Sequence, residues 1–226
     1  RMCPEAPVPV FAPGNKIVKN GGMAYNVYKN ILSLDSEIDV DIFTNKNWRN
    51  ITKTRYVDYR TNYIVLRLDE NDNEYGACNV SEINYDQYDA IVISDYNKGF
   101  LSESDIEYIS TMHDVTFLDT KKILGDWSKK IKFIKINDVE YEKTKHSLTD
   151  VIENNIITTM GPKGCKYRGK TYPVPKVEIK DTGGAGDTFI AALSSMYIKT
   201  KDIDESIMFA NECATKVVQR KGIVTV

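Results

Sequence analysis

The stretch Ala90-Ile91-Val92-Ile93-Ser94-Asp95-Tyr96-Asn97-Lys98-Gly99 has the pattern of a buried β-strand that runs into a turn. Its first half is apolar and rich in β-branched side chains, as in a parallel strand that is covered on both faces. Ser102 then has the character of a helix N-cap, and acidic residues occupy the first turn. Apolar residues follow at helical spacing, namely Ile106, Ile109 and Met112. The stretch therefore predicts a β-loop-α unit.

The same order of elements recurs downstream. Strands are predicted over residues 115–118, 131–136 and 156–159, with a short helix over 139–145. Two long helices close the chain, one opening after Gly186 and the other spanning about 204–220. Repeated β-then-α order predicts an α/β fold with a doubly wound, mainly parallel sheet.

The first third of the chain has a different pattern. Residues 8–11, 16–19 and 54–68 predict strands of a small sheet, set apart from the βα repeats. No internal repeat, low-complexity tract or Gly/Ser linker separates this part from the rest. We therefore expect a single domain over residues 1–226, with a small β-sheet lid whose strands come from about 5–20 and 52–70.

Composition excludes several classes of protein. The 30 Lys+Arg against 32 Asp+Glu leave no basic excess to hold a nucleic-acid backbone. The apolar runs fall far short of the ~20 residues that cross a membrane, and no signal peptide opens the chain, so we expect a cytoplasmic protein. The 4 cysteines form no C-x-x-C pair and the 2 histidines lie far from them, so neither a zinc site nor a disulfide framework is expected.

The most specific motif is Asp181-Thr182-Gly183-Gly184-Ala185-Gly186-Asp187-Thr188-Phe189, at the start of a predicted helix. Its glycines let successive backbone N–H groups converge, and the helix N-terminus adds partial positive charge, which together suit a phosphate. A carboxylate beside a phosphate is repulsive, so Asp187 is interpreted as a base that takes a proton from an attacking hydroxyl. The alternative is a glycine-rich helix cap with Asp187 as an ordinary first-turn acid.

Three shorter motifs accompany it: Gly21-Gly22-Met23-Ala24-Tyr25-Asn26, Asn137-Asp138-Val139-Glu140 and Thr159-Met160-Gly161-Pro162-Lys163-Gly164. The first suits a hydroxyl-rich ligand, because glycine permits close approach and asparagine both donates and accepts hydrogen bonds. Each motif also has a plain alternative: a Gly-Gly turn before a helix, a chance spacing of Asn and Glu, and a glycine turn leading into a hairpin.

Together these motifs resemble the ribokinase-like (PfkB) carbohydrate kinases, whose signature is D-T-x-G-A-G-D. The resemblance implies transfer of a phosphoryl group from ATP to a sugar, with Asp187 as the catalytic base. It assigns the anion hole to Gly184, Ala185 and Gly186. It assigns Mg²⁺ and phosphate contacts to Asn137, Asp138, Val139 and Glu140, with Glu140 reaching Mg²⁺ through water, and nucleotide contacts to Thr159, Gly161, Gly164 and Asn211. Gly21, Gly22 and Asn26 are assigned to the sugar, and a monovalent cation is a further expectation.

Residues 1–10, 64–69 and 92–99 are similar to the members of this family that phosphorylate D-glycero-β-D-manno-heptose 7-phosphate at its anomeric oxygen. By this resemblance Asp95 faces the sugar hydroxyls. Lys98 either contacts the 7-phosphate or is an exposed structural lysine. A ribokinase-like or fructokinase-like activity stays open, as does a protein that keeps the fold and binds nucleotide or sugar phosphate without turnover.

The chain departs from the family pattern at its two ends and after Ile31, besides tolerable changes at Thr120, Lys122 and Ile136. Nothing before Arg1 supplies the first strand with its G-D-x-x-x-D-like element, so the sequence is truncated or that sugar contact is lost. Between Ile31 and Thr52 roughly two dozen residues are missing, about a strand and a helix, so we expect a sheet that is narrower on one side. The chain stops at Val226, and no nucleotidyltransferase half is expected.

The apolar face of the small sheet predicts that two copies of the chain associate. An isolated ribbon with one apolar face is only marginally stable in water, so that face needs a cover. In the resembling kinases the equivalent sheet clasps the same sheet of a second subunit. We therefore expect a homodimer that buries Val8, Val10, Ile64 or Leu66 against their symmetry mates.

Overall fold

The main sheet has six strands in the order β3-β4-β5-β6-β7-β8. The computed structural model describes residues 2–8, 10–12, 14, 17–58, 60–61, 63–72 and 76–226. Strands β3 (Ile91–Asp95), β4 (Thr116–Thr120), β5 (Phe133–Asn137) and β6 (Ile156–Thr159) are parallel. Strands β7 (Cys165–Tyr167) and β8 (Lys170–Tyr172) add an antiparallel hairpin beyond β6. The predicted mainly parallel sheet is confirmed.

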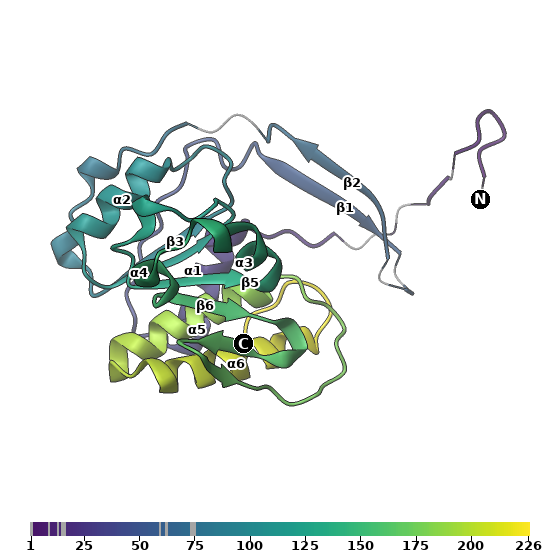
Figure 1. Cartoon of the computed structure of the whole chain (residues 1–226). Coiled ribbons are helices and arrows are strands. Elements are labelled where there is room, and N and C mark those ends of the chain that lie inside the picture. The colour runs from purple at the N-terminus through teal and green to yellow at the C-terminus, as the bar shows by residue number, and fades with distance from the viewer. Residues whose placement is uncertain are drawn as a thin grey trace.

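Helices cover both faces of this sheet (Figure 1). Helices α1 (Met23–Leu34), α5 (Ala185–Thr200) and α6 (Ile203–Val218) pack on one face, and α2 (Glu103–Met112), α3 (Asp138–Thr144) and α4 (Asp150–Glu153) on the other. Successive strand residues alternate between the two faces, so Phe117 joins the core under α5 while Leu118 joins the core under α2. The chain is therefore doubly wound, as predicted.

Short connections complete the main body. They include the 3₁₀ turns η1 (Val80–Glu82), η2 (Tyr85–Gln87), η3 (Asp126–Ser128), η4 (Lys145–Ser147) and η5 (Gly161–Lys163). The predicted cap of α2 is present, because the Ser102 hydroxyl accepts from the Asp105 N–H at 3.1 Å and the Asp105 carboxylate accepts from the Ser102 N–H at 2.8 Å. Among the described residues, no helix combines the length and apolarity that a membrane crossing requires.

A separate two-stranded sheet, β1 (Thr52–Val57) and β2 (Ile64–Glu70), projects from the main body (Figure 1). The other two predicted strands are wrong for the described residues, since Val8, residues 10–11 and residues 17–19 lie in no strand. Pro9 and Lys16 lie outside the described residues. The physical reason is local: proline cannot donate to a ladder, and the Val8 N–H bonds to the Ala6 carbonyl at 2.7 Å in a tight turn.

The main sheet begins at β3. Among the described residues no strand of this sheet precedes β3, and residues 35–51, between α1 and β1, contain neither helix nor strand. The short connection after Ile31 thus accompanies an edge strand at β3, and a sheet narrower than the family pattern stays a prediction.

Candidate active site

Polar residues gather where the parallel strands end and α5 begins. Asp95 ends β3, Asn137 ends β5 and Thr159 ends β6, while Asp187 lies in the first turn of α5. The carboxyl ends of parallel strands are the usual ligand-binding edge of an open α/β sheet. The fold therefore brings these predicted site residues to one edge of the sheet.

Asp187 is buried, with 1% of its surface exposed. Its Oδ2 accepts a hydrogen bond from Asn26 Nδ2 at 2.7 Å, whereas its buried Oδ1 has no hydrogen-bond partner within the described part of the chain. Desolvation raises the pKa of this carboxyl to about 7, opposed by the Asn26 hydrogen bond and reinforced by the charge of Asp119. A carboxylate with one unsatisfied oxygen and a pKa near neutrality suits a general base.

The signature loop forms a cradle that depends on its glycines. Gly184 is the N-cap of α5 at φ 80, and a Cβ there would lie 2.8 Å from Asn26 Nδ2. Within the described chain, the N–H groups of Gly184 and Gly186 have no protein acceptor, whereas the Ala185 N–H donates to the Thr182 carbonyl at 3.3 Å. Two of the three predicted anion-hole groups are therefore available to an anion.

Two charged residues that the sequence interpretation missed lie beneath this cradle. Lys135 Nζ lies 2.8 Å from Asp119 Oδ2, and both side chains are buried. A Cβ on Gly186 would lie 2.6 Å from the same ammonium. The signal for Lys135 was present, because a lysine within the apolar run 133–136 must find a partner when it is buried. Its positive charge adds to that of the helix N-terminus at the cradle.

The Asn137–Glu140 motif caps α3. Asn137 Oδ1 accepts from the Glu140 N–H at 2.8 Å, and Glu140 Oε2 accepts from the Asn137 N–H at 2.9 Å. Lys121 pairs with the other Glu140 oxygen. Among the described residues no three potential ligands form a metal cage. Because Mg²⁺ commonly keeps several waters and binds through few carboxylates plus phosphates, Glu140 fits an ion that it reaches through water.

The segment assigned to the nucleotide also has a structural role. Gly164, at φ 83, would place a Cβ 2.0 Å from the Tyr172 carbonyl oxygen, so glycine is needed where β7 meets β8. Asn211 Nδ2 donates to the same carbonyl at 3.0 Å, which fastens α6 to β8. Gly161 faces open space, and Thr159 Oγ1 lies 3.4 Å from the Ile136 carbonyl. The glycine turn does lead into a hairpin, and nucleotide contact stays a prediction.

The residues assigned to the sugar lie in two parts of the fold, at the start of α1 and at the end of β3. Asn26, in the first two turns of α1, donates to Asp187 and borders a cavity of about 380 Å³. Gly22 is the N-cap of α1 at φ 84. Asp95 is buried and accepts from Thr120 Oγ1 at 2.7 Å and from Lys122 Nζ at 3.1 Å. Their sugar contacts stay predictions, and so does that of Gly21, which precedes the cap.

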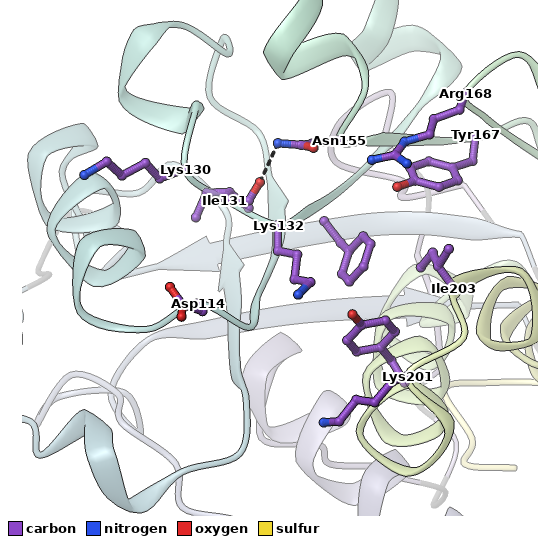
Figure 2. A pocket seen from close by; sticks show the side chains of 11 residues that line it. Asp114, Lys130, Ile131, Lys132, Asn155, Tyr167, Arg168, Lys201 and Ile203 are labelled. Atoms are coloured by element: carbon purple, nitrogen blue, oxygen red, sulfur yellow. Dashed lines mark hydrogen bonds between the residues drawn. The ribbon is translucent and has the colours of Figure 1, made fainter.

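A second cavity, of about 360 Å³, lies apart from this site (Figure 2). Lys132 and Asn155 line this cavity, and they directly precede β5 and β6, so the cavity lies at the amino ends of these strands. Lys132 and Lys201 both lie within 6 Å of the Tyr197 ring centroid, at 5.5 and 5.8 Å. The cavity lies at the amino ends of the parallel strands, whereas Asp187 lies near their carboxyl ends. The cavity is therefore not part of the candidate active site.

The doubly wound sheet, the glycine cradle and the buried carboxylate define a phosphotransferase with a ribokinase-like fold. The fold is similar to that of the ribokinase from Thermotoga maritima, with a TM-score of 0.59 and 17% identity over 76% of this chain and 64% of that one. It is also similar to a nucleoside kinase from Methanocaldococcus jannaschii, with a TM-score of 0.52 and 18% identity over 75% of this chain and 61% of that one. The pfkB family carbohydrate kinase model matches residues 35–225, and the chain therefore belongs to this family, whose acceptor is an alcohol group.

Two curated proteins are similar to nearly the whole length of this chain. The chain is 27% identical to the Bifunctional protein HldE of Helicobacter pylori, over 98% of this chain and 59% of the relative. It is also 27% identical to the Bifunctional protein HldE of Hydrogenovibrio crunogenus, over 100% of this chain and 57% of the relative. The chain thus spans less than two thirds of the length of these relatives.

Proposed function

We propose that this chain transfers the γ-phosphoryl group of ATP to the anomeric hydroxyl of D-glycero-β-D-manno-heptose 7-phosphate. The observation that carries the proposal is the buried Asp187, whose Oδ1 lacks a partner in the described structure beside the free N–H groups of Gly184 and Gly186. Whole-chain similarity to proteins named HldE supports a kinase, and the heptose is proposed from the similar segments at residues 1–10, 64–69 and 92–99.

In the proposed reaction, Asp187 Oδ1 takes the proton of the attacking hydroxyl. The free N–H groups of the cradle, the N-terminus of α5 and the Lys135 ammonium stabilise the negative charge on the transferred group. Glu140 would hold Mg²⁺ through water, and the ion, when bound with ATP, would neutralise phosphate charge. Gly161 and the end of β6 line the proposed nucleotide side of the site.

A pair of lysines supports a phosphorylated acceptor. Lys98, in the loop after β3, donates to Asp72 Oδ2 at 2.7 Å, and Lys53, in β1, pairs with Asp72 Oδ1. Two ammonium groups from the main body and the small sheet thus hold one carboxylate, which is an arrangement that also suits a phosphate. We propose that the sugar phosphate binds to Lys98 and Lys53 in place of Asp72.

A phosphorylation assay over a panel of sugars and sugar phosphates tests the activity. We expect product with heptose 7-phosphate and none with its unphosphorylated form. Turnover of ribose or fructose phosphates instead would favour another sugar kinase of this family. Mg²⁺-ATP at 100 times its Kd should stabilise the fold by about 2.7 kcal/mol. Stabilisation without turnover of any acceptor would favour a binding protein that keeps the kinase fold.

We also propose that two subunits pair through the β1–β2 sheet. The apolar side chains Tyr56, Val57, Ile64, Leu66 and Leu68 are each 43 to 49% exposed in the single chain. Such a ribbon gains little stability on its own, and a second copy would remove these side chains from water.

A further inference from the structure

A chain of buried amides connects the first helix to the proposed base. Asn30 lies one turn after Asn26 in α1 and has 0% of its surface exposed. Its side chain contacts Asn26 on one side and Thr188, the neighbour of Asp187 in α5, on the other. None of the motifs identified in the sequence includes Asn30, yet it is hydrogen-bonded to both helices that build the site.

The orientation of the Asn30 amide is determined by a backbone group. Asn30 Nδ2 lies 2.8 Å from the carbonyl oxygen of Asn26, and a carbonyl oxygen can only accept. The nitrogen must therefore face Asn26, which leaves Asn30 Oδ1 to accept from Thr188 Oγ1 at 3.0 Å. The Asn30 amide cannot turn over without losing a hydrogen bond, and Asn30 and Thr188 are both fully buried, so water cannot replace the lost bond.

The Asn30 amide in turn orients the Asn26 amide. Asn30 Nδ2 also lies 3.4 Å from Asn26 Oδ1, so the oxygen of the Asn26 side chain faces the donor on Asn30. The nitrogen of Asn26 then faces Asp187, at 2.7 Å from Oδ2. Two amides in series thereby present an N–H group, and not a carbonyl oxygen, to the carboxyl group of Asp187.

We propose that Asn30 is a positioning residue that locks the Asn26 amide with its N–H toward Asp187 and so favours the ionised form of this carboxyl. Its part in turnover rests on the proposed function, whereas its effect on the carboxyl does not. An N–H donor stabilises the carboxylate more than the protonated acid. An Asn26 amide free to rotate would present Oδ1 to a protonated carboxyl and accept its O–H, which would stabilise the inactive acid.

Other charged and titratable groups face Asp187 from the elements around it. They are Asp119 in β4, Lys121 after β4, Lys135 in β5 and Tyr96 after β3. None of them is hydrogen-bonded to Asn30 in the described structure, so a substitution at Asn30 leaves their direct effects on Asp187 in place.

The test compares Asn30→Leu with Thr188→Val. Both variants lose the hydrogen bond between Thr188 and Asn30, but only Asn30→Leu releases the Asn26 amide. The titration of the Asp187 carboxyl carbon is followed by NMR, with its signal assigned by its loss in Asp187→Asn. We expect the midpoint to rise by about one pH unit in Asn30→Leu, since a hydrogen bond to a charged group is worth roughly that much. Thr188→Val should titrate like the wild type.

Equal midpoints in the wild type and Asn30→Leu, or equal shifts in both variants, would overturn the inference. If Asn30→Leu does not fold, Asn30→Ala gives the same comparison with less steric demand. The pH at which kcat/KM falls to half on the acid side should shift by the same amount as the NMR midpoint. An NMR shift in a protein that phosphorylates no sugar would uphold the positioning role and reject the proposed kinase activity, so the two failures are distinguishable.

Discussion

The ammonium of Lys135 lies 2.8 Å from Asp119 Oδ2, directly beneath the backbone of Gly186. Removing one partner of a buried ion pair leaves an uncompensated charge, which costs about 3 to 5 kcal/mol. We therefore expect Lys135→Met to lower the free energy of unfolding by that amount in urea denaturation. The double variant Asp119→Leu/Lys135→Met should recover most of the loss. An additive loss in the double variant would show that the two charges do not stabilise one another.

Asp187→Asn preserves the shape of the side chain and removes its ability to take a proton. We expect kcat to fall by a factor of about 10² to 10⁴. The affinity for ATP should hold or rise, since a negative charge beside the phosphates is removed. Asp126→Asn, at an exposed acid in η3, serves as the control. A variant retaining more than about a tenth of the wild-type rate would exclude Asp187 as the general base.

The raised pKa of Asp187 predicts how activity depends on pH. Because the base works only when it is deprotonated, kcat/KM should increase with pH and level off above the pKa of about 7. A midpoint near 4, the ordinary value for aspartate, would contradict the desolvation of this carboxyl.

The raised pKa of Asp187 also predicts how the free energy of unfolding changes with pH. The folded protein holds the Asp187 proton up to about pH 7, whereas the unfolded chain releases it near pH 4. Wild-type stability should therefore fall, relative to Asp187→Asn, by about 1.4 kcal/mol per pH unit as the pH rises through this window. Denaturation of both proteins at several pH values measures the difference, and a gap that is constant with pH would oppose the prediction.

The exposed ribbon predicts the oligomeric state. Ile64, 49% exposed in the single chain, should lie within the proposed dimer interface, so Ile64→Glu should convert dimers to monomers and weaken sugar binding. Ile123→Glu introduces the same charge at a side chain that is 50% exposed outside the ribbon, and should leave the dimer intact. Light scattering distinguishes the two masses. A fully active wild-type monomer would show that β1 and β2 need no second subunit.

The sequence by itself determined the elements whose signals are local. Side-chain periodicity and backbone preferences within short stretches predict strands β3 to β6, the cap at Ser102 and the start of α5. The structure has these elements within two residues of the predicted positions. The glycine signature likewise predicted the tight turn at the start of α5, because glycine is required by its own backbone and immediate surroundings. Its binding of a phosphate stays a prediction. For the described residues before position 20, the prediction of strands was wrong, since short apolar alternation does not guarantee a partner strand.

Only the tertiary structure decided which distant groups meet at Asp187. The Asn26 amide reaches that carboxyl from 161 residues away, and Asp119 and Lys135 form their ion pair across neighbouring strands. Burial and the identity of the hydrogen-bond partners set the pKa of the carboxyl, and one of its oxygens has no hydrogen-bond partner among the described residues. These quantities depend on which surfaces are removed from water and which donors lie within 3 Å, and a linear pattern of residue types contains neither.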